Sequence, residues 1–132
     1  MLAALVGLLV AFPAAAEAKY SLRYFELSPT CVKPGGAVNA RVGIRQDELL
    51  KLQPLYSRVV VRQSATGLVV KQEDQGPVYF PYGNWEIRRV ETIPSNAPYG
   101  DYTVTLLLGS KRGGSEWGSA SRSLSVRPAG FC

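Results

Sequence analysis

The chain of 132 residues contains no histidine, only one methionine and only two cysteines. Without histidine, it cannot form a histidine-ligated zinc or copper site, a Ser-His-Asp triad or a Cys-His dyad. The sequence also lacks a Walker loop, a nucleophile elbow and a calcium-binding loop. We therefore expect a protein that is not an enzyme and that uses no cofactor and no metal.

The acidic residues are too scattered to indicate a paired-carboxylate site. Glu86 and Glu91 are separated by an odd number of positions on one expected strand, so their side chains should fall on opposite faces. The pairs Asp47-Glu48 and Glu73-Asp74 are typical of loops. This pattern again disfavours catalysis.

Long runs of like charge are also missing, since no acidic or basic run exceeds two residues. The net charge is +5, and it becomes +6 without residues 1–18, which contain one acid and no base. Such a charge suits an anionic polysaccharide or an acidic protein as partner. It is equally explained as a charge that keeps the protein in solution.

An uninterrupted apolar run occupies residues 2–12 and is followed by Pro13 and a small-residue stretch that ends at Ala18. The run is shorter than the roughly twenty apolar residues that a transmembrane helix needs. This pattern predicts a secretory signal peptide over 1–18 and a single domain over 19–132, although no Lys or Arg precedes the run. We expect a secreted or periplasmic protein with no stable membrane span after cleavage and no nucleic-acid partner.

Beyond the apolar run, hydrophobic residues alternate with polar ones, and Gly or Pro interrupts the pattern every eight to twelve residues. We expect polar residues 73–77 to form a connection and Asp47 to cap one helical turn over 48–52. Seven or eight short strands without a long helix predict an all-β, two-sheet sandwich, with a small barrel as the alternative. The expected strands are Tyr20–Leu27, Ala37–Arg45, Ser57–Gln63, Leu68–Gln72, Trp85–Ile93, Asp101–Leu108 and Ala120–Val126.

One local motif gives a more specific indication. The segment Pro98-Tyr99-Gly100-Asp101-Tyr102 opens the penultimate expected strand. It resembles the corner of immunoglobulin-like and fibronectin type III-like domains of bacterial surface and periplasmic proteins, and the resemblance extends over residues 20–127. It implies that the Tyr102 hydroxyl bonds back to the preceding loop. Because the antibody-type Cys pair and intervening Trp are absent, the resemblance is to the wider superfamily.

The two cysteines, Cys31 and Cys132, are expected to pair, because an exported chain enters an oxidising compartment. In the immunoglobulin-like topology, the first strand runs parallel to the last. The resemblance therefore implies that the first turn and the end of the chain lie at the same pole. The alternative is two free thiols, or a bridge from Cys132 to another chain.

Aromatic residues crowd one loop and the start of the next strand. Tyr79, Phe80, Tyr82 and Trp85 are candidates for a platform that stacks on sugar rings or holds a peptide. Aromatic side chains also contribute strongly to cores. The same four rings are therefore also candidates for closing one end of the sandwich, and this is the interpretation that the sequence favours.

Two further candidate surfaces carry basic residues. The Gly-rich connection Gly109–Gly118 carries Lys111, Arg112 and Trp117, either as a contact loop or as a mobile solvent loop. The basic residues Arg41, Arg45 and Arg88 are expected to share an outer sheet face, where they either meet an anionic ligand or simply extend into solvent.

These features together predict a non-catalytic binding or assembly module of the cell envelope that recognises a protein or polysaccharide. Immunoglobulin-like domains commonly serve adhesion, assembly or recognition, but the fold itself does not specify the ligand. A small accessory or inhibitor subunit that acts through Gly109–Gly118 is the alternative.

Overall fold

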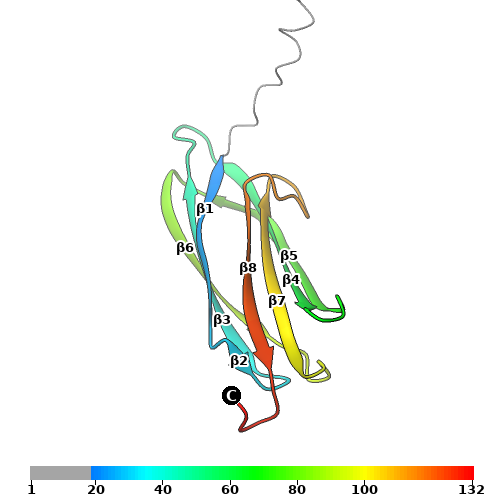
Figure 1. Ribbon diagram of the computed structural model, residues 1–132. Helices are drawn as coiled ribbons and strands as arrows, with labels where there is room; N and C mark the ends of the chain where they lie inside the picture. The colour runs from blue at the N-terminus through cyan, green and yellow to red at the C-terminus, as the bar shows by residue number, and fades with distance from the viewer. Residues whose placement is uncertain (1–18) are drawn as a thin grey trace, which may run out of the picture.

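The computed structural model describes residues 19–132, which form strands and connecting loops without a helix (Figure 1). The predicted signal peptide over residues 1–18 lies outside the described residues. The strands form two separate layers, as the alternation of the sequence predicted, rather than a closed barrel.

The first sheet has three strands in the order β1-β3-β6, and the second has five in the order β2-β8-β7-β4-β5. Neighbouring strands are antiparallel except for β2 and β8, which pair in parallel. The first sheet contains β1 (Tyr20–Ser28), β3 (Ala37–Gln46) and β6 (Gly83–Thr92). The second contains β2 (Cys31–Val32), β4 (Gln53–Gln63), β5 (Val69–Phe80), β7 (Gly100–Gly109) and β8 (Gly118–Val126).

The core lies between the sheets and is built from the alternating positions of β3 and β7. Each large apolar side chain removed from water contributes roughly 1.5–3 kcal/mol, and a slip of one residue would expose the whole row. Both strands therefore have one register that buries their apolar face. The buried residues are Val38, Ala40, Val42 and Ile44 from β3 and Tyr102, Val104, Leu106 and Leu108 from β7.

The predicted connection at residues 73–77 is wrong, because β5 continues through it to Phe80. The register between β4 and β5 shifts between Leu55 and Ser57. Gly76 lies at this shift with a φ of 127°, and a Cβ there would lie 2.7 Å from the Leu55 carbonyl oxygen. Gly76-Pro77 therefore forms a bulge in an edge strand, a position where proline is tolerated.

The helical turn expected over 48–52 is also wrong, because the segment has no helical hydrogen bonding. Asp47 does not cap this segment but accepts a hydrogen bond from Arg45 Nε at 2.8 Å. The Gln46 side chain organises the segment instead.

β6 pairs with β3 without interruption from Gly83 to Thr92, so Arg88 and Arg89 lie within an unbroken strand. Arg122 lies on the core-facing side of β8, also in unbroken register, and its side chain is exposed. It therefore lies at the rim of the sandwich.

The tyrosine corner is present as predicted. The Tyr102 hydroxyl donates a hydrogen bond of 2.6 Å to the Pro98 carbonyl oxygen, and the ring is 1% exposed. This bond fixes the loop before β7 against the strand that it enters. Together with the strand order, it establishes an immunoglobulin-like β-sandwich.

Replacing Tyr102 with phenylalanine is expected to lower the free energy of unfolding by about 1–2 kcal/mol, because one buried hydroxyl bond is lost while the ring is kept. The matched control is Tyr99→Phe on the same loop, whose ring is 58% exposed. Urea denaturation of both variants measures the difference. Equal free energies of unfolding for the two variants would show that the bond between Tyr102 and Pro98 does not stabilise the fold.

Candidate binding surface

Gln46 organises the loop that joins β3 to β4. Its side chain is fully buried, and Nε2 donates hydrogen bonds to the carbonyl oxygens of Lys51 at 3.2 Å and Phe80 at 3.1 Å. Its Oε1 accepts a hydrogen bond from the backbone N–H of Glu48. The amide thus holds both ends of the loop and leaves the leucines between them outside the core.

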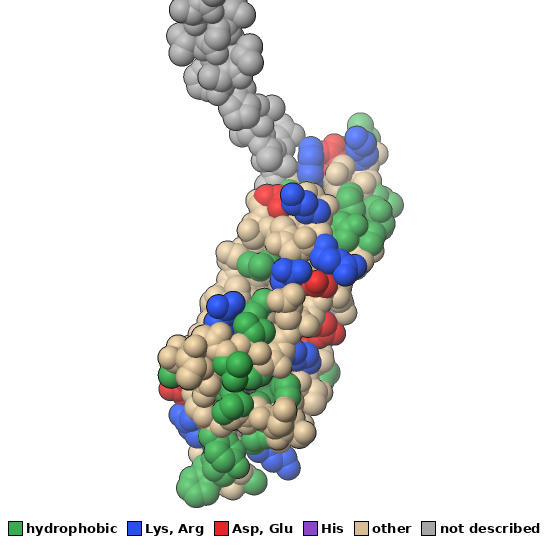
Figure 2. Space-filling view, turned by 90° about the vertical axis from the view of Figure 1, so that its right-hand side faces the viewer, with side chains coloured by type: hydrophobic (Ala, Val, Ile, Leu, Met, Phe, Trp, Pro, Cys, Tyr) green, Lys and Arg blue, Asp and Glu red, His purple; other side chains and the backbone are tan. Residues whose placement is uncertain are grey.

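Those leucines form an exposed apolar surface. Leu49, Leu50 and Leu52 are 69%, 92% and 58% exposed. They line a shallow hollow of about 180 Å³ together with Pro81 and Tyr82 from the turn between β5 and β6, and the charged residues Glu48 and Lys51 complete its lining. Figure 2 shows hydrophobic side chains gathered at the upper end of the molecule. We call Leu49, Leu50, Leu52, Pro81, Tyr82 and the adjoining Trp85 the loop-end patch.

Of the four predicted aromatic residues, Phe80 packs against the core, Tyr82 and Trp85 belong to this patch, and Tyr79 is exposed outside both. Phe80 is partly buried, and its ring centroid lies 6.5 Å from Tyr20 and 5.7 Å from Trp85. Trp85 is 40% exposed, and its indole N–H donates to the Pro81 carbonyl oxygen at 2.9 Å. Tyr79 precedes Phe80 in β5, and because side chains alternate along a strand, its ring lies on the opposite side of the sheet. The rings therefore both close the sandwich and extend onto its surface.

Tyr82 lies beside Arg45, one residue of the predicted basic face. The guanidinium carbon is 5.2 Å from the ring centroid, and Arg45 Nη2 donates to the Tyr82 hydroxyl at 2.9 Å. One face of this ring is therefore occupied by the guanidinium group. The sequence pattern predicts a helical turn over 48–52 and so does not reveal this surface. Three leucines in a short interstrand loop are the signal that could have revealed it.

The predicted basic face exists, but its charges are paired. Arg41, Arg45 and Arg88 lie on the outer side of the first sheet, as expected. Arg41 contacts Glu86 at 2.7 Å and Arg88 contacts it at 2.6 Å, while Arg45 contacts Asp47 at 2.8 Å.

The Tyr24 ring covers this face where Gly43 has no side chain, since a Cβ on Gly43 would lie 2.0 Å from the ring. The hydrogen bond from the Tyr24 hydroxyl, followed by those from Arg88 and Arg41, lowers the pKa of Glu86 to about 2. Glu86 therefore stays ionised and offsets the charge of the arginines. The face is a poor match for a highly charged anion.

In the Gly109–Gly118 connection, the predicted surface position of Trp117 is wrong. Trp117 is 8% exposed, and its ring centroid lies 5.3 Å from that of Tyr20. Trp117 is therefore part of the core. The sequence does not predict the burial of Trp117, because the ring enters the core from a glycine-rich loop that has no alternating pattern.

The rest of this connection folds onto the molecule. Glu116 accepts hydrogen bonds from the backbone N–H and the hydroxyl of Ser110, and Gly113 lies against the Arg58 guanidinium. Lys111 and Arg112 are exposed, as predicted for either a contact loop or a solvent loop. These contacts hold the loop close to the five-stranded sheet.

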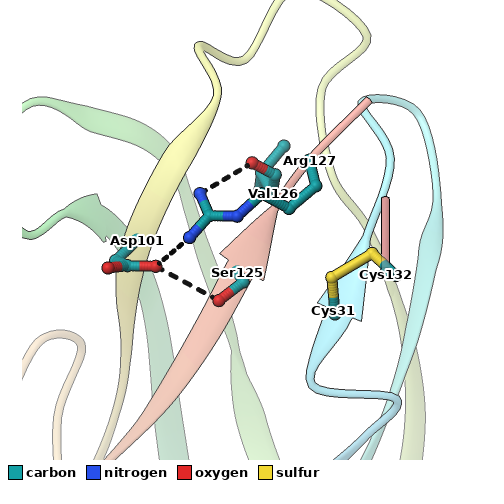
Figure 3. The surroundings of a disulfide bond; sticks show 6 residues. All are labelled: Cys31, Asp101, Ser125, Val126, Arg127 and Cys132. Atoms are coloured by element: carbon teal, nitrogen blue, oxygen red, sulfur yellow. Dashed lines mark hydrogen bonds and ion pairs between the residues drawn. A yellow bond between two sulfur atoms is a disulfide. The ribbon is translucent and has the colours of Figure 1, made fainter. Parts of the chain in front are cut away.

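The disulfide forms as predicted between Cys31 and Cys132, whose Cα atoms are 5.6 Å apart (Figure 3). It lies at the end of the sandwich opposite the loop-end patch (Figure 1). Beside it, the Arg127 N–H donates to the Val32 carbonyl oxygen at 2.9 Å and extends the parallel pairing of β2 and β8. The fold therefore brings the end of the chain to the first turn.

Within residues 19–132, no three His, Cys, Asp or Glu side chains gather where they could hold a metal ion. The same residues contain no helix long and apolar enough to cross a membrane. No protein-family model and no curated protein sequence matches this chain.

Several solved structures share the fold at low sequence identity. The Pseudomonas fluorescens alkylpurine DNA glycosylase AlkC, bound to DNA containing an abasic site analog, matches with a TM-score of 0.59 at 17% identity, over 90% of this chain and 33% of its own. A Paenibacillus cycloisomaltooligosaccharide glucanotransferase complexed with cycloisomaltoheptaose matches with a TM-score of 0.58 at 16% identity, over 84% of this chain and 14% of its own.

The CARDB domain of a Pyrococcus furiosus protein, in complex with di-metal ions, matches with a TM-score of 0.52 at 13% identity. The match covers 81% of this chain and 91% of that domain. This chain therefore spans a third or less of the two enzymes but nearly the whole CARDB domain. At these identities, the likeness shows the fold alone: a β-sandwich that also occurs as one part of larger proteins.

Proposed function

We propose that residues 19–132 form a non-catalytic binding module that recognises a protein partner through the loop-end patch. The observation that carries this proposal is the exposure of Leu49, Leu50 and Leu52 beside Tyr82 and Trp85. A contiguous apolar patch is costly to expose to water and often marks an interaction site. Burying it against a partner would recover that free energy.

The chemistry of the patch favours a protein over a polysaccharide. Sugar rings stack on flat, open aromatic faces, but Arg45 covers one face of Tyr82, and Phe80 lies 5.7 Å from Trp85. Leucine side chains instead contribute most to the binding free energy when they are buried against other apolar side chains. An apolar surface on a partner protein, such as the face of an amphipathic helix, is the complementary structure.

We also propose that the module acts outside the cytoplasm. The apolar run before Ala18 has the length of a secretory signal, and a disulfide is stable in an oxidising compartment. An inhibitor that acts through Gly109–Gly118 has less support, because that loop is closed by the bond between Ser110 and Glu116 and lies against Arg58 of β4.

The test is capture of partners from an extract of the cell envelope of the source organism by immobilised residues 19–132. We expect the variant Leu49→Ser/Leu50→Ser/Leu52→Ser to weaken binding of the captured protein at least about tenfold, because these residues form the centre of the proposed interface. Surface substitutions of this kind change the stability of the fold by only about 0.5 kcal/mol or less. Titration calorimetry with the identified partner measures the change.

The matched control replaces three exposed apolar residues elsewhere on the surface, in the variant Leu68→Ser/Val90→Ser/Phe131→Ser. This control should bind as the unchanged protein does. Equal binding by the two triple variants would contradict the assignment of the patch. Specific retention on a glycan array without a protein partner would contradict the choice of partner.

A further inference from the structure

The sandwich is open along one long side, where the edge strands of the two sheets face the same gap. β5 ends one sheet and β6 ends the other, and only Pro81 and Tyr82 connect them. No ladder of backbone hydrogen bonds joins these two strands. Side chains alone therefore close this side of the core.

Behind these side chains lies a cavity of about 130 Å³. Its walls are mostly apolar and come from both sheets, with Phe25, Val42, Val59, Ile87, Leu106 and Leu108 among them. Apolar cavities of this order hold a single benzene-sized molecule. Val78 and Gln75 are exposed at the β5 edge of the same cavity, so the route from solvent passes between flexible side chains.

Glu91 places a carboxylate in the wall of this cavity. Its side chain is 5% exposed, and it lies 3.1 Å from both Lys71 Nζ and Arg89 Nη2. Each oxygen faces one of these bases, but neither contact has the angles of a full hydrogen bond. Burial, and next the contact with Glu73, raise the pKa of the carboxyl group, while Lys71 and Arg89 oppose the shift. Buried acceptors are normally hydrogen-bonded, so this group has unused capacity to accept a donor.

The charges around Glu91 select the kind of donor. Lys71 and Arg89 already supply two positive charges beside the carboxylate, and Glu73 lies 3.1 Å from Arg89. A cationic ligand would be repelled by the two bases, and an anionic ligand by the two acids. A neutral hydroxyl group is free of both penalties.

We propose that this cavity binds a small neutral alcohol or phenol, with its hydrocarbon part among the core side chains and its hydroxyl donating a hydrogen bond to Glu91. The site is separate from the loop-end patch, and the binding proposed there does not depend on it.

The experiment titrates isotope-labelled residues 19–132 with phenol and with toluene, which has a similar shape but no hydroxyl. We expect saturable shifts in the NMR signals of Val59, Ile87 and Leu106 with both compounds. Replacing Glu91 with methionine should lower the affinity for phenol about tenfold, the effect of losing a hydrogen bond to a charged group, and leave the affinity for toluene unchanged.

A second variant tests the cavity without altering Glu91. Ala40 lines the cavity, and Ala40→Leu should fill most of it and abolish binding of both compounds. The control is Ala120→Leu, at a partly buried position outside the cavity lining. The absence of saturable binding, binding that survives Ala40→Leu, or an equal loss of phenol and toluene affinity in Glu91→Met would each overturn the proposal.

Discussion

Replacing Cys31 and Cys132 together with serine is expected to lower the free energy of unfolding by about 2–5 kcal/mol. The two residues are 101 positions apart, so the bridge closes nearly the whole described chain into one loop. On the chain-entropy account, a loop of this length restricts the unfolded state by up to about 4.7 kcal/mol. The native state offers little to replace the bridge, because β2 pairs with β8 over only two residues.

Urea denaturation of the double variant measures this effect, and reduction of the unchanged protein with a thiol reagent should reproduce it. Removing both cysteines together avoids a free thiol that could dimerise. A loss below about 1 kcal/mol would show that the unfolded chain is already compact or that the bridge is strained, since either condition reduces the gain from crosslinking.

Replacing Trp117 with alanine is expected to lower the free energy of unfolding by about 3–5 kcal/mol, the usual cost of deleting a large aromatic side chain from a core. Trp117 packs on Tyr20, which is itself fully buried. The Tyr20 hydroxyl donates to the Gln53 carbonyl oxygen at 2.6 Å and accepts from the Phe80 N–H at 3.0 Å. Loss of the indole would therefore also loosen the contact that joins β1 to the start of β4 and the end of β5.

The natural control is Trp85→Ala, because Trp85 is 40% exposed and lies at the rim. We expect this change to cost about 1 kcal/mol or less, within the range typical of substitutions away from the core. These are the only two tryptophans in the chain, so fluorescence of the remaining one reports unfolding in each variant. Similar losses from the two variants would contradict the assignment of Trp117 to the core and Trp85 to the rim.

The parts of the fold that the sequence predicted correctly are those where a local pattern and tertiary packing agree. The strands around Val42 and Leu106 alternate because one face of each is buried. Tyr102 follows a Pro-x-Gly turn, and this local motif predicted the hydrogen bond from its hydroxyl to the preceding loop. The cysteine pair was predicted from the expected export of the chain together with the topology that the resemblance implies.

The parts that the sequence did not predict depend on long-range contacts. Trp117 enters the core from a glycine-rich loop, and Gly76-Pro77 bends an edge strand instead of ending it. Glu91 faces inward because its strand pairs with β3 in a register that places it opposite Val38. The loop-end patch was missed because Gln46, fully buried and bonded across two loops, determines where the leucines lie.

The disulfide also determines how the domain would respond to tension. If the two ends of the described chain were pulled apart, force would pass from Lys19 along β1 to Cys31 and then directly across the bridge to Cys132. Everything between the two cysteines would be excluded from the loaded path. Mechanical resistance would then depend on the hydrogen bonds between β1 and β3. Unfolding under force would lengthen the chain only by the short segment before Cys31, at about 3.4 Å per residue.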